Sequence, residues 1–205
     1  MPEPVRAQPP DYYYRAYTQM HHPAHWFHKR RLGFLASLVP NDSVVLDAGC
    51  GSGVLAWLLT QKGCLVTGVD YDAARLEFAQ QICLESAFVL GDLRQLNLSR
   101  QFDVVICADV LEHFSEQERP VVVTNLVRHL KHDGLLILSF PSLAYCALEP
   151  LWWLARRFLF RYRWWDDQPK HHRVEPSIIT DCTAVRDGAI CLGLVHYSVI
   201  RRLKS

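Results

Sequence analysis

The stretch that decides the fold is Val44-Val45-Leu46-Asp47-Ala48-Gly49-Cys50-Gly51-Ser52-Gly53. An apolar run ends in an acid, passes through three alternating glycines and leads into the apolar segment from Val54 to Leu59. Glycine is needed where the backbone turns sharply or where a ligand comes close to it. The start of a helix offers amide donors to an anionic or strongly polar ligand. The stretch therefore predicts a strand, a glycine turn and a helix that together bind a nucleotide-type cofactor.

The glycine spacing distinguishes two cofactors of this type. The dinucleotide fingerprint G-x-G-x-x-G/A needs a small third residue at the position that is Val54 here. Asp47, just before the first glycine, would repel a pyrophosphate but suits a ligand with an amino group and a positive centre. S-adenosylmethionine carries both groups. The residues therefore favour S-adenosylmethionine, with NAD as the alternative.

Further apolar runs at 65–69, 87–90, 103–108 and 135–140 predict strands separated by helical stretches. Continuous apolar strands of this kind are typical of a parallel sheet that is covered on both faces. Asp70, Asp92 and Asp109 follow three of these runs, at the carboxyl ends where such sheets bind ligands. We therefore expect an α/β, Rossmann-like, doubly wound and mostly parallel sheet with helices on both faces and an antiparallel C-terminal strand.

The chain resembles the class I S-adenosylmethionine-dependent methyltransferases, in particular the group of ubiquinone-biosynthesis O-methyltransferases and small-molecule enzymes. The resemblance extends over roughly residues 40–140 and keeps the order of the family's motifs. It rests on Leu46-Asp47-Ala48-Gly49-Cys50-Gly51-Ser52-Gly53, Val69-Asp70, Gly91-Asp92-Leu93, Phe102-Asp103-Val104-Val105, Val110-Leu111-Glu112-His113 and Leu130-Lys131-His132-Asp133-Gly134-Leu135.

The resemblance implies a role for individual residues around the methionine half of S-adenosylmethionine. Asp47 would lie near its amino group, and Ala108 and Asp109 would lie beside the sulfonium and the transferring methyl group. The residues that would face the methionine half are Gly49, Cys50 and Gly51.

The resemblance also implies how the nucleoside half is held. Asp70 would bind both ribose hydroxyls, and its position about 20 residues beyond the glycine turn is the usual place for a ribose-binding acid. Tyr71 would lie against the adenine. Asp92 would accept a hydrogen bond from the adenine amino group, and Leu93 would flank the ring.

Composition agrees with a single domain of this class. A chain of 205 residues is long enough for one well-buried core. The balance of 22 basic and 21 acidic residues gives no reason to expect nucleic acid as a partner. Seven scattered cysteines without a C-x-x-C pair, and an N-terminus without a signal-peptide core, indicate a reducing cytoplasm.

The N-terminal segment precedes the predicted cofactor unit and contains His21, His22, His25 and His28. Their spacing fits no zinc signature, and no cysteine or carboxylate lies near enough in the sequence to complete a site, so we expect no metal. In the resembling enzymes this segment covers the cofactor pocket, which implies a cap over residues 1–40. The residues of the cap expected to contact cofactor or substrate are Tyr12, Tyr13, Tyr14, His25 and Trp26.

Residues 141–175 form a second segment outside the cofactor unit, rich in arginine and tryptophan between 150 and 165. This stretch is too short and too charged to span a bilayer, which takes about 20 mostly apolar residues. It suits either an aromatic lid on the protein's own pocket or a helix lying in a membrane interface. The resembling ubiquinone-pathway enzymes imply a lipid-tailed or aromatic substrate, with His172 and Arg173 as further candidate substrate contacts.

Methyl transfer to oxygen requires alignment of the nucleophile with the methyl group and often the removal of a proton. His113, just past the strand at 103–108, is the first candidate for the general base because the imidazole pKa lies near neutrality. Glu112 beside it would orient the imidazole or help to hold a divalent ion. The alternative is that both residues are a structural pair at a helix start.

The C-terminal region departs from the family's pattern. We expect a helix over residues 176–185, and the 17 residues after Gly188 leave room for one long strand or a cramped hairpin. This predicts six strands in a chain organised as a cap (1–40), a cofactor core (41–140), a lid (141–175) and a closing helix and strand (176–205). The shortened sheet raises an alternative function, a weak or inactive S-adenosylmethionine-binding scaffold.

Overall fold

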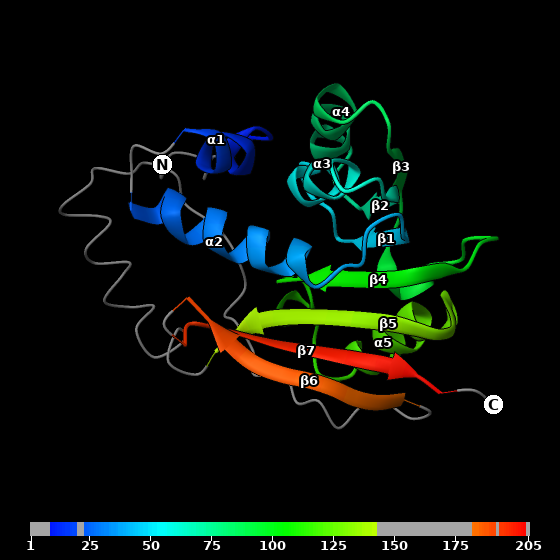
Figure 1. The fold of residues 1–205 in the computed structure, drawn as a ribbon. Helices are drawn as coiled ribbons and strands as arrows, with labels where there is room; N and C mark the ends of the chain where they lie inside the picture. The colour runs from blue at the N-terminus through cyan, green and yellow to red at the C-terminus, as the bar shows by residue number, and fades with distance from the viewer. Residues whose placement is uncertain (1–8, 20–22, 143–181, 192, 204–205) are drawn as a thin grey trace, which may run out of the picture.

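The computed structural model describes residues 9–19, 23–142, 182–191 and 193–203, which form one sheet with helices on both faces (Figure 1). The seven strands of these residues follow the order β3-β2-β1-β4-β5-β7-β6. They are β1 (Val44–Ala48), β2 (Leu65–Asp70), β3 (Ala87–Leu90), β4 (Phe102–Ala108), β5 (Leu130–Pro141), β6 (Cys182–Ile190) and β7 (Val195–Arg202).

Five α-helices and two short 3-10 turns accompany the described strands. The helices are α1 (Tyr12–Thr18), α2 (Pro23–Ser37), α3 (Val54–Thr60), α4 (Ala73–Ile82) and α5 (Arg119–Arg128), and the turns are η1 (Leu93–Gln95) and η2 (Leu111–His113). Among the described residues, no helix has the length and apolar character needed to cross a membrane.

The parallel part of the sheet follows directly from the apolar runs. β3, β2, β1, β4 and β5 pair in parallel, and Val45, Leu46, Asp47 and Ala48 of the central strand β1 are all buried. Helices shield both faces, because α2 and α3 pack on one side and α5 packs on the other. The prediction of a doubly wound, mostly parallel sheet is confirmed.

The α2 helix is held to the sheet by an apolar stripe. Leu32, Leu35 and Ala36 of α2, and Val39 just after the helix ends at Ser37, recur at intervals of three and four residues and are buried against β1, α3 and β7. The N-terminal half of α2 runs on past the carboxyl ends of β4 and β5 (Figure 1). This geometry carries polar residues of α2 to the edge of the sheet where ligands bind.

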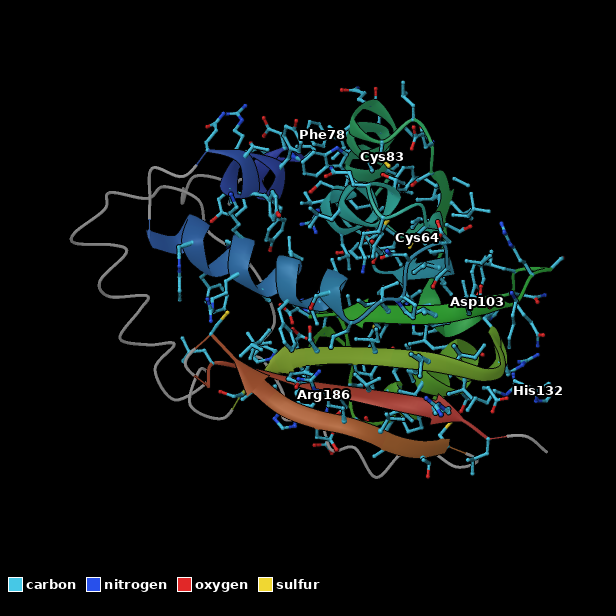
Figure 2. The ribbon with its side chains drawn as sticks, viewed as in Figure 1. Cys64, Phe78, Cys83, Asp103, His132 and Arg186 are labelled. Atoms are coloured by element: carbon cyan, nitrogen blue, oxygen red, sulfur yellow. The ribbon has the colours of Figure 1, made fainter. Side chains whose placement is uncertain are left out.

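Aromatic side chains attach α1 to the cofactor core. Tyr14 meets Trp57 of α3 edge-on at 6.0 Å between ring centroids and Phe78 of α4 at 5.8 Å. Tyr17 meets Trp57 in the same way at 6.0 Å. Figure 2 shows Phe78 on the side of α4 that faces α1 and places Asp103 at the far end of the sheet. The described part of the N-terminal segment therefore lies against the helices that follow the glycine turn.

The C-terminal prediction was wrong in two respects. Residues 182–185 belong to strand β6 rather than to a helix, and residues 176–181 lie outside the described residues. β6 and β7 form an antiparallel hairpin, and β7 also pairs antiparallel with β5, so the sheet has seven strands instead of six.

The position of the turn explains the error. The prediction placed Asp187-Gly188 between the helix and the strand, but both residues lie inside β6. A Cβ on Gly188 would lie 2.8 Å from the ring of Tyr197 on β7. The chain reverses instead after Ile190, with Cys191 at φ 54° and Gly193 at φ 83°.

Candidate active site

The glycine turn between β1 and α3 uses each of its three glycines differently. All three have positive φ, 78° at Gly49, 51° at Gly51 and 74° at Gly53. A side chain on Gly49 would overlap Val110, and one on Gly53 would lie 2.7 Å from the Cβ of Ala79. A Cβ on Gly51 would meet nothing within 4 Å. Gly49 and Gly53 are therefore packed against protein, whereas Gly51 borders open space.

The amide donors of this turn are mostly engaged within the protein, contrary to the expectation of free donors. The N–H groups of Gly49 and Cys50 donate to the carbonyl of Val69, at 2.8 and 3.0 Å. The N–H of Gly51 donates to Asp70 Oδ2 at 2.7 Å, and that of Gly53 to the carbonyl of Cys50 at 2.9 Å. The turn thus offers a ligand space and carboxylates rather than a row of amide donors.

Asp70 at the end of β2 is fixed by two backbone donors. Its Oδ2 accepts from Gly51, and its Oδ1 accepts from the N–H of Asp72 at 3.0 Å. Only 6% of the residue is exposed. A carboxylate has about four acceptor sites, so two remain for further donors beside the glycine turn.

Asp47 is a buried carboxylate at the carboxyl end of β1. It is 2% exposed, and its Oδ2 has no hydrogen-bond partner among the described residues. Burial, and secondarily the charge of Asp70, raises the pKa of Asp47 to about 7. A buried acceptor of this kind is a place where a ligand's amino group gains a charge-assisted hydrogen bond.

The raised pKa of Asp47 predicts a pH-dependent stability. The folded chain holds this proton more tightly than the unfolded chain, so Asp47 lowers the free energy of unfolding as pH rises from about 4 to about 7. Relative to wild type, Asp47→Asn should gain on the order of 2–4 kcal/mol between pH 5 and pH 8. Urea unfolding of the ligand-free proteins at both pH values measures this gain. An equal stability difference at both pH values would contradict the burial of a titrating carboxylate.

Asp92, the acid after β3, is engaged by a neighbouring arginine. Arg94 donates from Nε to Asp92 Oδ1 and Oδ2, at 3.0 and 2.9 Å, and from Nη1 to Glu118 Oε1 at 2.6 Å. The hydrogen bond from Arg94 lowers the pKa of Asp92. Sequence reasoning missed Arg94, although its position two residues after an acid was a local signal.

The two predicted neighbours of the adenine have different environments. Tyr71 follows β2 and is 79% exposed, the largest aromatic exposure that the described residues show, so its ring is available to a ligand. Leu93 begins η1 and is buried in the core.

Ala108 ends β4, and Asp109 follows it in a left-handed conformation with φ 53°. The N–H of Asp109 donates to the carbonyl of Ser139 at 2.9 Å, and Asp109 Oδ1 accepts from Ser139 Oγ at 2.8 Å. Its Oδ2 forms an ion pair with Arg31 of α2. Sequence reasoning also missed Arg31 and Ser139, because contacts between residues so far apart in the chain leave no local signal.

Glu112 and His113 are adjacent in η2 but have different exposures. Glu112 is 1% exposed, and burial raises its pKa to about 7 although the charges of Arg31 and Arg119 act to lower it. His113 is exposed. The accessible member of the pair is thus the imidazole.

The candidate substrate residues are only partly within the described residues. Trp26 is 48% exposed, and the guanidinium of Arg30 lies over its ring. Tyr14 packs on α3 and α4 as described above. The side chain of His25, and both His172 and Arg173, lie outside the described residues, as does the stretch 150–165.

The arrangement fits S-adenosylmethionine at the carboxyl edge of the sheet. A buried acceptor (Asp47), an acid with remaining acceptor sites (Asp70) and open space at Gly51 lie around one turn. An amino group and a ribose diol are the groups that such acceptors bind. The two carboxylates would repel the negatively charged pyrophosphate of a dinucleotide, so the site does not favour NAD.

Comparison with known proteins agrees with this fit. Residues 45–134 match the family described as "Methyltransferase domain". The ubiquinone biosynthesis O-methyltransferase of Rickettsia typhi is 33% identical over 99 residues, which cover 46% of this chain and 39% of that protein. The enzyme of the same name from Haemophilus ducreyi is 36% identical over 105 residues, 46% of this chain and 44% of that protein. The matched region thus spans about two fifths of the length of these relatives.

Solved structures show the same fold across most of the chain. Magnesium protoporphyrin IX methyltransferase from Synechocystis, with bound S-adenosylhomocysteine, has a TM-score of 0.69 at 24% identity, covering 93% of this chain and 92% of that one. The N-methyltransferase NodS from Bradyrhizobium japonicum has a TM-score of 0.61 at 18% identity, covering 84% and 93%.

The fold is that of a Rossmann-like domain, and the candidate ligand site lies at the carboxyl ends of its parallel strands. Together with the match of residues 45–134 to a methyltransferase domain, they make this part of the chain similar to a class I S-adenosylmethionine-dependent methyltransferase domain.

Proposed function

We propose that this chain transfers a methyl group from S-adenosylmethionine to a small-molecule acceptor, at an oxygen of an aromatic or lipid-tailed substrate. The observation that carries the proposal is the set of three buried or mostly buried acids, Asp47, Asp70 and Asp109, around a turn that is open at Gly51. The matched relatives are O-methyltransferases by name, which supports oxygen as the acceptor atom.

The cofactor, when bound, supplies an electrophilic methyl group on a sulfonium. Asp47 accepts from the amino group of the methionine half, which lies along Gly49, Cys50 and Gly51. Ala108 and Asp109 lie at the end of the cofactor from which the methyl group leaves. Holding the methyl group in line with the acceptor oxygen accounts for much of the rate in such a reaction.

The nucleoside half is held by the next two strand ends. Asp70 accepts from both ribose hydroxyls through the acceptor sites that Gly51 and Asp72 leave open. The exposed ring of Tyr71 stacks on the adenine. Asp92 shares its carboxylate between Arg94 and the adenine amino group, with Leu93 beside the ring.

His113 is the proposed general base, because it is exposed in η2, four residues after Asp109 and adjacent in sequence to the buried Glu112. Glu112 supports the loop from inside the core rather than binding substrate. Trp26 at the exposed end of α2 is the proposed substrate contact among the described residues. The alternative of a weak or inactive scaffold was based on a shortened, six-stranded sheet, and the sheet has seven strands among the described residues.

Gly51→Ala should separate cofactor binding from folding. The new methyl group enters the open space at Gly51 without touching protein, so it obstructs the cofactor while the left-handed conformation costs about 1–2 kcal/mol of stability. We expect the Kd for S-adenosylhomocysteine, measured by calorimetry, to rise about tenfold or more. Gly193→Ala is the matched control, because Gly193 also has positive φ and open space.

The catalytic part of the proposal is tested with S-adenosylmethionine labelled in the methyl group. Purified wild type and Gly51→Ala are incubated with phenols and catechols, with and without a prenyl tail, and extracted label is counted. Transfer by wild type that falls in Gly51→Ala supports the proposal. Cofactor binding without transfer to any oxygen acceptor, but with transfer to amines, would contradict the assignment of the acceptor atom.

A further inference from the structure

We propose that Arg31 is a positioning residue that neutralises Asp109 and thereby sets the charge at the methyl-transfer end of the site. The inference rests on the proposed function, which places the cofactor sulfonium beside Asp109. It adds a residue from α2, outside the family-matched region 45–134, to the machinery of the site.

The first support is the position of the pair. Arg31 lies near the middle of α2, one residue before Leu32 of the apolar stripe, and its side chain reaches Asp109 just past the end of β4. The Arg31 and Asp109 side chains are only 12% and 15% exposed. At such low exposure, an ion pair interacts far more strongly than a surface pair does, and loss of one partner leaves a costly charge.

The second support is the way Asp109 is held. Its backbone is in the left-handed region, which costs a residue with a side chain on the order of 1 kcal/mol and is typical of functional sites. Ser139 takes one carboxylate oxygen and Arg31 takes the other. The Asp109 carboxylate is therefore held in place from both sides, and the Arg31 guanidinium compensates its negative charge at Oδ2.

The third support is the excess of acids around this point. Asp47, Asp70 and Glu112 are buried at the same edge of the sheet. The other buried arginine nearby, Arg119, donates from Nε to the carbonyls of Leu111 and Phe114, at 3.2 and 3.1 Å. Arg31 pairs directly with the acid that follows β4.

The consequence concerns substrate and product cofactor. S-adenosylmethionine carries a positive sulfonium, whereas S-adenosylhomocysteine carries a neutral thioether in its place. Without Arg31, the negative charge of Asp109 would favour the binding of S-adenosylmethionine over S-adenosylhomocysteine. Without Asp109, the positive charge of Arg31 would have the opposite effect. Because the two charges of the pair compensate each other, the affinity of the site depends little on the sulfonium charge. S-adenosylmethionine and S-adenosylhomocysteine should therefore bind with more similar affinities.

The test is the ratio of the two affinities, measured by calorimetry on the full chain. Arg31→Gln should increase the preference for S-adenosylmethionine over S-adenosylhomocysteine by about fivefold or more, and Asp109→Asn should shift it in the opposite direction. Arg31→Lys, which keeps the charge, and the double variant Arg31→Gln/Asp109→Asn should both stay near the wild-type ratio.

Arg30→Gln is the matched control, since Arg30 is the next residue of α2 but lies over Trp26 instead. It should leave the ratio unchanged. An equal loss of both affinities in Arg31→Gln, or shifts of the same sign in Arg31→Gln and Asp109→Asn, would overturn the inference and leave Arg31 a purely structural residue. Absence of binding of either ligand to wild type would instead overturn the proposed function.

Discussion

Replacement of Asp70 by alanine is expected to weaken the binding of S-adenosylhomocysteine by about a hundredfold or more. The change removes the acceptor proposed for both ribose hydroxyls, and hydrogen bonds to a charged group contribute more than neutral ones. It also frees the N–H of Gly51, which loses its 2.7 Å hydrogen bond and with it the order of the glycine turn. Calorimetric titration of wild type and variant measures the loss.

Asp72→Ala is the control for this prediction. Asp72 is an acid two residues further on, and its carboxylate caps α4 by accepting from the N–H groups of Ala74 and Arg75, at 3.0 and 3.2 Å. Its removal should cost about 1 kcal/mol of stability and leave the affinity unchanged. Equal losses of affinity in the two variants would show that Asp70 acts through local folding and not as a ribose ligand.

Gly53→Ala is expected to be the most destabilising of the glycine substitutions proposed for this turn. A Cβ there would lie 2.7 Å from the Cβ of Ala79 and 3.2 Å from its Cα, so α3 and α4 must separate. The positive φ of 74° adds strain. We expect the free energy of unfolding in urea to fall by about 3 kcal/mol or more.

The comparison with Gly193→Ala isolates the steric part of that loss. Gly193 has a similarly positive φ of 83° but open space, so its substitution should cost only the backbone strain, about 1–2 kcal/mol. If both variants lost the same stability, close packing of α4 against the glycine turn would not be what requires glycine at position 53.

The parallel core could be predicted because its information is local. Each apolar run from Val44 to Phe140 became a strand, and the acids that follow them lie at one edge because parallel strands share their carboxyl edge. The C-terminal hairpin could not be predicted in the same way. Asp187-Gly188 has the composition of a turn, but the ring of Tyr197 requires a glycine inside the strand.

The residues of the candidate site also differ in whether local sequence was enough to predict them. Asp47, Asp70 and Asp109 were predicted from their places at the carboxyl ends of apolar runs, whereas Arg31 belongs to a helix whose position depends on tertiary packing. The order of residues in this segment also did not predict which side chain is buried. Glu112 and His113 are adjacent in η2, but Glu112 is buried in the core and His113 is exposed. Arg94 shows a third case, in which a local neighbour engages a predicted ligand residue.

The central claim is that the acids around Gly51 form an S-adenosylmethionine site, and calorimetric titration of the wild-type chain with S-adenosylhomocysteine tests it most directly. We predict binding at a single site with a micromolar Kd. Absence of binding to S-adenosylhomocysteine together with binding of NADH would contradict the claim, and would mean that Asp47 and Asp70 surround a different cofactor.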